Sequence, residues 1–207
     1  MKKNSIVIIG SGGHARSCID VIEYQAIYSV AGFLSHPSDL VSEIFGYKCL
    51  GSDEVLPQLV RQYKKIVLGI GQIKNPDTRV NLFQKLKQIG YDLPIIVSPA
   101  AYVSERAIIG EGTIIMHGAI INAGAVVGKN CIINTNALIE HDASVGDHTH
   151  ISTGAIINGG VNIGPKTFIG SRAVIKNQIE VGANCIVGMG ATLGRGLDDD
   201  GIFYAGG

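Results

Sequence analysis

The chain has 207 residues with 17 basic and 17 acidic side chains, so its formal net charge is zero. This balance argues against a broad basic surface for a nucleic-acid polymer. Hydrophobic residues make up 46% of the chain and charged residues 16%, which excludes disorder over most of its length. No segment approaches the ~18 consecutive apolar residues of a membrane span, so we expect a soluble cytoplasmic protein without a membrane partner.

The first 96 residues alternate apolar runs with helical patterns. Strands are predicted at 6–9, 30–34, 65–70 and 93–97, and helices from the end of a glycine-rich loop to about residue 24 and over 77–88. Parallel strands need such crossover helices between them. The pattern therefore predicts a small parallel α/β sheet of Rossmann-like type.

The loop Gly10-Ser11-Gly12-Gly13-His14-Ala15 joins the first strand to the first helix. Backbone N–H groups in such a loop, together with a helix N-terminus, cradle phosphate. The spacing also matches a dinucleotide fingerprint, but Ser35 and His36 stand after the second strand where an acidic residue is expected. We therefore expect a nucleotide-sugar diphosphate rather than a nicotinamide cofactor; the alternative is a tight turn that only closes the sheet.

The second half has a period of six residues. From residue 97 to residue 193, every sixth position is Val, Ile or Leu, and the residue four places later is usually small. A six-residue period fits neither a helix nor a hairpin, but it fits a β-solenoid with stacked short strands. The inward column comprises Val97, Val103, Ile109, Ile115, Ile121, Val127, Ile133, Ile139, Val145, Ile151, Ile157, Ile163, Ile169, Ile175, Val181, Val187 and Leu193.

This repeat resembles the hexapeptide [LIV]-G-x-x-[small]-x of left-handed parallel β-helix acyltransferases. A glycine loop domain before an uninterrupted solenoid is similar to the sialic-acid O-acetyltransferase family, which includes the amino-sugar N-acetyltransferases of the bacillosamine and perosamine pathways. The resemblance implies an α/β nucleotide-sugar-binding domain over 1–96 and an all-β left-handed parallel β-helix over 97–207, with three hexapeptides per coil. It also implies a homotrimer that binds acetyl-CoA between neighbouring solenoids.

The family's catalytic motif is an Asn followed seven residues later by a His and an acid, which Asn134, His141 and Asp142 match. An imidazole suits proton removal from an acceptor amine or hydroxyl. A carboxylate would orient the ring, and spacing does not decide between Asp142 and Glu140.

The neighbours of His141 in adjacent coils, three hexapeptides away on either side, are small residues, Ala123 and Gly159. We therefore expect a hollow beside the imidazole that admits the acceptor.

Further site residues follow from the resemblance. His150 is expected to contact acetyl-CoA near the thioester carbonyl, and either His150 or a backbone amide would donate a hydrogen bond to the developing oxyanion. Gly159 and Gly160 are expected to leave room for the pantetheine arm. In the first half, Gln72 and Arg79 resemble a G-N…R segment with Gln in place of Asn. Arg79 would reach a phosphate or remain a solvated helix charge, and both residues join loop residues 10–14 in the expected substrate site.

We expect an acetyl-CoA-dependent acetyltransferase that acts on an amino or hydroxyl group of a nucleotide-linked sugar, for surface glycan synthesis. His141 would act as general base in a direct attack on the thioester. N- and O-transfer stay open because one base serves both, so an O-acetyltransferase of sialic acid or another free sugar is an alternative.

Two alternatives of another class are a γ-carbonic-anhydrase-like zinc enzyme and a non-catalytic trimerising module. The zinc reading is disfavoured because His117 and His141 are four hexapeptides apart, which is one coil plus one further face, so they do not stack. The cysteines form no CxxC pair either, so no metal is expected.

Overall fold

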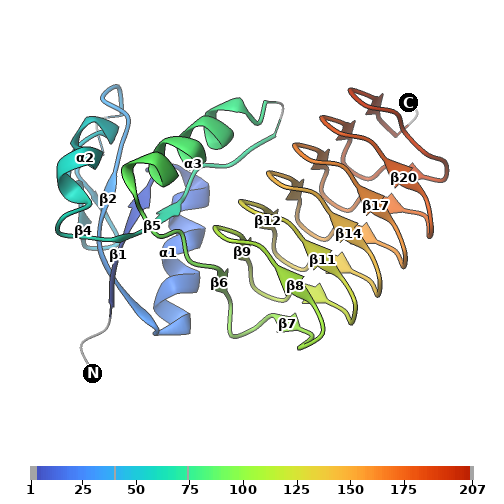
Figure 1. The fold of residues 1–207 in the computed structure, drawn as a ribbon, viewed down its shortest axis with the longest axis horizontal. Coiled ribbons are helices and arrows are strands. Elements are labelled where there is room, and N and C mark those ends of the chain that lie inside the picture. Colours follow the sequence, from blue (N-terminus) through green and yellow to red (C-terminus); the bar gives the residue numbers. More distant parts are fainter. Residues whose placement is uncertain (1–3, 40, 74, 206–207) are drawn as a thin grey trace.

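A computed structural model describes residues 4–39, 41–73 and 75–205. Its first part is built on a three-stranded parallel sheet in the order β2-β1-β5 (Figure 1). The strands are β1 Asn4–Ile9, β2 Tyr28–Leu34 and β5 Lys65–Leu68. These three strands were predicted from their apolar runs. A short hairpin of β3 Glu43–Ile44 and β4 Tyr47–Lys48, followed by the helical turns η1 Asp53–Val55 and α2 Leu56–Leu59, has too few residues to leave a periodic signal.

Two longer helices cover opposite faces of this sheet. Helix α1, Gly13–Gln25, packs between the sheet and the solenoid, where its apolar face shares a core with Ile114 and Ile132. Helix α3, Asp77–Ile89, covers the other face through Phe83 and Leu86. Neither these helices nor any other in the described part of the chain is long and apolar enough to cross a membrane.

The predicted fourth strand of the α/β sheet, 93–97, is wrong. Only Asp92 forms an isolated bridge, to Lys65, and the segment then leaves the sheet. Its last two residues form β6, Ile96–Val97, which pairs with β9 in the solenoid. Burial of Leu93 and Ile96 is compatible with either sheet, so hydrophobicity alone did not reveal which sheet the segment joins.

The remaining strands form three parallel sheets that make about six turns of a solenoid. One sheet contains β7 Tyr102–Val103, β10 Ile120–Ile121, β13 Leu138–Ile139, β16 Ile156–Ile157, β19 Val174–Ile175 and β22 Thr192–Leu193. The second contains β8 Ile108–Ile109, β11 Val126–Val127, β14 Ser144–Val145, β17 Asn162–Ile163 and β20 Glu180–Val181. The third contains β6, β9 Ile114–Ile115, β12 Ile132–Ile133, β15 His150–Ile151, β18 Phe168–Ile169, β21 Ile186–Val187 and β23 Ile202–Phe203.

The six-residue period is confirmed in every coil. Each predicted column residue is the second residue of a two-residue strand, and the column from Ile115 onward is buried. Partners in neighbouring coils are three hexapeptides apart, as for Ile121 and Ile139. Small residues such as Ala119 and Ala137 are fully buried at the corners, where a larger side chain would not fit.

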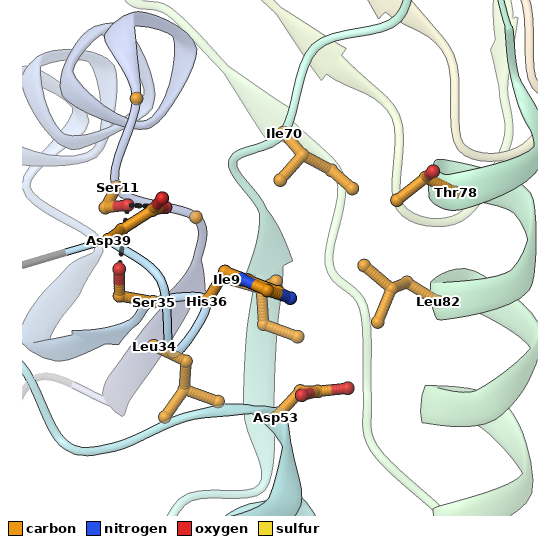
Figure 2. A pocket seen from close by; sticks show the side chains of 12 residues that line it. Ile9, Ser11, Leu34, Ser35, His36, Asp39, Asp53, Ile70, Thr78 and Leu82 are labelled. Carbon is orange, nitrogen blue, oxygen red and sulfur yellow. Dashed lines mark hydrogen bonds between the residues drawn. The ribbon is translucent and has the colours of Figure 1, made fainter.

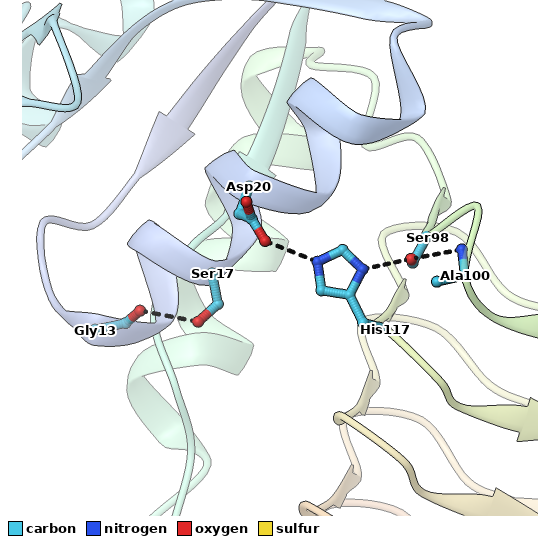
Figure 3. Close-up of polar contacts among 6 residues, drawn as sticks. All are labelled: Gly13, Ser17, Asp20, Ser98, Ala100 and His117. Carbon is cyan, nitrogen blue, oxygen red and sulfur yellow. Dashed lines mark hydrogen bonds and ion pairs between the residues drawn. The ribbon is translucent and has the colours of Figure 1, made fainter.

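A chain of hydrogen bonds joins α1 to the first coils (Figure 3). Asp20 Oδ2 lies 2.8 Å from His117 Nε2, and His117 Nδ1 lies 2.6 Å from Ser98 Oγ. Ser98 Oγ also accepts a bond from the backbone N–H of Ala100. Although this chain contains Ser, His and Asp, Ser98 is only 1% exposed, so it presents no nucleophile to a substrate. We assign it to docking of the helix on the solenoid.

Candidate active site

The glycine loop borders a cavity of about 400 Å³ at the carboxyl ends of β1, β2 and β5 (Figure 2). Gly10 has φ of +117°, and a Cβ there would lie 2.8 Å from the backbone oxygen of Gly69, so only glycine fits. Gly12 precedes α1 with no side-chain cap, which leaves the first N–H groups of the helix available to an anion. The cavity is lined by Ile9, Gly10, Ser11, Gly12, Leu34, Ser35, His36, Asp39, Asp53, Ile70, Thr78 and Leu82.

An acidic side chain does reach the glycine loop from beyond β2. Ser35 Oγ donates to Ser11 Oγ at 2.9 Å, and Ser11 Oγ donates to Asp39 Oδ2 at 3.0 Å. No acid directly follows Leu34 in the sequence, but a turn brings Asp39 back to the loop from five residues further on. A Pro-Ser-Asp turn signal at 37–39 was the available clue.

Arg79 does not line the cavity, and the expectation that it is a solvated helix charge is wrong. It is 1% exposed, and its Nη1 donates to the backbone oxygens of Leu68 and Ile70 at 2.8 Å each. Its Nε donates to the oxygen of Asn130 in the solenoid at 3.3 Å. The guanidinium is therefore not a solvated charge: it donates to carbonyls at the end of β5 and links them to the solenoid.

Gln72 and His14 also lie at the junction between the α/β part and the solenoid. Gln72 is 3% exposed, and its Nε2 donates to the backbone oxygen of His148 at 2.8 Å. His14, in the first turn of α1, is half-buried; burial, reinforced by Arg79, lowers its pKa to about 3. A neutral His14 would add no positive charge for a phosphate, so the backbone N–H groups of the loop are the donors that this region offers to an anion.

His141 lies on an exposed corner after β13. Of the two candidate acids, one contacts its ring and the other its backbone. Its Nδ1 is 2.9 Å from Asp142 Oδ2, whereas the Glu140 carboxylate accepts from the His141 backbone N–H at 3.2 Å. The hydrogen bond to Asp142 is the main reason that the pKa of His141 is raised above 6.5. Asp142 therefore orients the ring, and 65% of the His141 side chain remains exposed.

The imidazole of His141 lies against the backbone of the next coil. A Cβ on Gly159 would stand 2.7 Å from Nε2 and 2.8 Å from Cε1 of the ring. A small residue is therefore needed at position 159, as the repeat predicted. The imidazole ring itself occupies the space above Gly159. The following Gly160 has φ of +67° and donates its N–H to the His141 backbone oxygen at 3.0 Å.

We predict that Gly159→Ala lowers kcat by ~10-fold or more, because the new methyl group displaces the imidazole. Thermal unfolding should change little, since the hydrogen bond that the displaced ring would lose, to Asp142, is exposed. Gly194→Ala is the matched control, because a Cβ there meets nothing within 4 Å. Equal activities of the two variants in an assay of CoA release would contradict this placement of the ring.

Asn134 contacts His150 rather than His141. The Nδ2 of Asn134 lies 3.2 Å from His150 Nε2, and His150 Nδ1 lies 2.5 Å from the backbone oxygen of Gln72. His150 is 6% exposed, and its burial lowers its pKa to about 4. Asn134 and His150 thus form a pair at the junction, while His141 and Asp142 occupy the next corner along the chain.

No cluster of three or more His, Cys, Asp or Glu side chains with metal-binding geometry occurs in the described residues. The histidines of the zinc alternative have other partners: His117 contacts Asp20, and His148 Nδ1 lies 2.9 Å from Asn130 Nδ2.

Two family models match the sequence. Residues 5–86 match the PglD N-terminal domain, and residues 106–141 and 160–195 match the bacterial transferase hexapeptide of six repeats. No curated protein sequence matches at a significant level.

Several solved structures share the fold over nearly the whole chain. A variant of perosamine N-acetyltransferase from Caulobacter crescentus, in complex with CoA and GDP-perosamine, is 31% identical, with a TM-score of 0.91 over 97% of this chain and 93% of that chain. The acetyltransferase domain of PglB from Neisseria gonorrhoeae, in complex with acetyl coenzyme A, is 27% identical, with a TM-score of 0.89 over 98% and 96%. WeeI from Acinetobacter baumannii is 21% identical, with a TM-score of 0.84 over 96% and 95%, and shows the fold alone.

Proposed function

Because this chain belongs to the hexapeptide-repeat acetyltransferases of the perosamine and bacillosamine type, we propose that it transfers acetyl from acetyl-CoA to the amino group of a nucleotide-linked sugar. The observation that carries the proposal is the His141 imidazole, which Asp142 holds against Gly159 with 65% of the side chain exposed. The cavity beside the glycine loop supports a nucleotide diphosphate as the part of the acceptor that is bound there.

In the proposed reaction, the acceptor nitrogen attacks the thioester carbonyl carbon while His141 Nε2 takes a proton from that nitrogen. The Asp142 carboxylate stabilises the imidazolium that forms. The tetrahedral intermediate then breaks its C–S bond, and the CoA thiolate leaves and takes up the proton.

Two buried cysteines are unsuited to an alternative route through an acyl-enzyme. Burial raises the pKa of both Cys18 and Cys131 to about 12, so neither supplies a thiolate. Direct attack without a covalent intermediate is therefore the proposed chemistry.

The acceptor is tested with acetyl-CoA and a panel of nucleotide-linked amino sugars, by release of the CoA thiol and by the mass gain of one acetyl group. We expect acetylation at nitrogen for at least one member of the panel. Acetylation of sialic acid or another free sugar, but of no nucleotide-linked amino sugar, would favour the O-acetyltransferase alternative. Absence of CoA release with every acceptor, and of thermal stabilisation by CoA, would favour a non-catalytic module.

We also propose the homotrimer that the family resemblance implies. One sheet presents an outward apolar column in which Tyr102 is 59% and Ile120 is 40% exposed, continued by Leu138, Ile156 and Val174. Monomers rarely expose a continuous apolar surface of this kind. We expect light scattering to give three times the mass of a single chain; the mass of one chain at micromolar concentration would contradict the proposal.

A further inference from the structure

Gln72 and the segment 148–150 are joined by two hydrogen bonds of opposite direction. His150 Nδ1 lies 2.5 Å from the backbone oxygen of Gln72, and the Gln72 side chain donates in return to the backbone oxygen of His148. We call Gln72, His148 and His150 the junction clasp. Both Gln72 and His150 are more than nine-tenths buried, so the clasp is shielded from competing water.

The clasp determines where the hydrogens lie on the ring of His150. A backbone carbonyl only accepts hydrogen bonds, so Nδ1 carries the hydrogen that points at Gln72. Burial lowers the pKa of His150 to about 4, so the ring is neutral near pH 7 and Nε2 has a free lone pair. This nitrogen is therefore an acceptor and cannot donate to a thioester oxygen.

The position of the hydrogen on the His150 ring also decides the orientation of the Asn134 amide. Since His150 Nε2 accepts, the atom that faces it at 3.2 Å is the Asn134 amide nitrogen. The Asn134 oxygen then accepts from the backbone N–H of Thr135 at 2.8 Å. One hydrogen of the amide points at His150, and the second remains for a ligand at this half-buried position.

We propose that His150 is a positioning residue for acyl transfer, which fixes the Asn134 amide so that its second N–H faces acetyl-CoA, and that His150 does not donate to the substrate itself. This inference rests on the proposed function. It revises the role expected for His150, because Gln72 and Asn134 occupy both nitrogens of its ring.

Two substitutions separate the bonds of His150. An amide nitrogen of Asn at this position stands near the place of Nδ1, so His150→Asn retains the bond to Gln72 and loses the acceptor for Asn134. The longer His150→Gln places a carbonyl oxygen near Nε2, so it retains the acceptor. We expect His150→Asn to lower kcat by ~10- to 100-fold with the KM for acetyl-CoA within about threefold, and His150→Gln to recover about tenfold of that loss.

Other outcomes would overturn the proposal. An equal rise in the KM for acetyl-CoA in both variants, with kcat retained, would indicate that His150 contacts acetyl-CoA directly. Lower melting temperatures with unchanged kcat and KM in both variants would indicate a purely structural residue.

An NMR measurement on the wild-type protein labelled with ¹⁵N-histidine tests the hydrogen order without relying on activity. We expect His150 to keep a protonated Nδ1 and a bare Nε2 from about pH 8 to 5, while the exposed His141 titrates in this range. The opposite tautomer in an active protein would refute the role of His150. The expected tautomer in a protein that acetylates no sugar would instead count against the proposed function.

Discussion

Replacing His141 with alanine is expected to lower kcat by ~10²-fold or more, because the change removes the general base of the proposed reaction. The side chain is exposed, with Asp142 as its hydrogen-bond partner, so the solenoid and its assembly should be unaffected. Steady-state release of CoA measures the loss, and light scattering checks the assembly. Turnover close to that of the wild type would remove His141 from the mechanism.

The pH dependence of kcat should distinguish the effects of Asp142 and Glu140 on the pKa of His141. The base acts when neutral, so activity should fall as the pH drops through the raised pKa of the imidazole. Asp142→Asn removes the main cause of the raised pKa, and the acid limb of the profile should move to lower pH. Glu140→Gln is the matched control and should move the limb less, because Glu140 makes the smallest contribution to this shift. Identical profiles for both variants would contradict the role of Asp142.

Replacing Arg79 with methionine should lower the free energy of unfolding by about 3 kcal/mol, although Arg79 lies outside the cavity. The substitution retains much of the buried volume but leaves the carbonyls of Leu68, Ile70 and Asn130 without this donor, at ~1–3 kcal/mol each. Part of this cost is offset because the guanidinium is itself desolvated, which lowers its pKa to about 10.

The control for Arg79 is Lys85→Met on the same helix. Lys85 pairs with Asp53 at 2.9 Å, and both side chains are more than 40% exposed, so the change should cost less than ~1 kcal/mol. Urea unfolding of both variants measures the difference. Equal midpoints would show that the Arg79 contacts contribute little to stability.

The solenoid could be predicted in detail because its information is local and repeated. Each coil contacts only its neighbours, so the spacing of Ile121 and Ile139 in the sequence is also their register in the sheet. The position of the glycine loop before α1 was predictable for a similar reason, since strand, loop and helix are consecutive.

The candidate site was only partly accessible to such reasoning. The small residue at Gly159 follows from the coil repeat, and the structure then places the His141 ring upon it. The choice of Asp142 over Glu140 depended on the turn at this corner, where Asp142 has φ of +59°. Adjacent positions in a sequence do not specify which carboxylate meets a ring nitrogen.

The amino-acid sequence by itself therefore determined the α/β start, the solenoid with its register, and the residues that carry the proposed chemistry. Only the tertiary structure decided that Arg79 and Gln72 hold the two parts together, and that Asp39 reaches the glycine loop. Gln72 and His150 lie far apart in the sequence, and no period or propensity links them. Their contact arises from the packing of α1 and the β5 end against the solenoid, where buried carbonyls require donors that distant side chains supply.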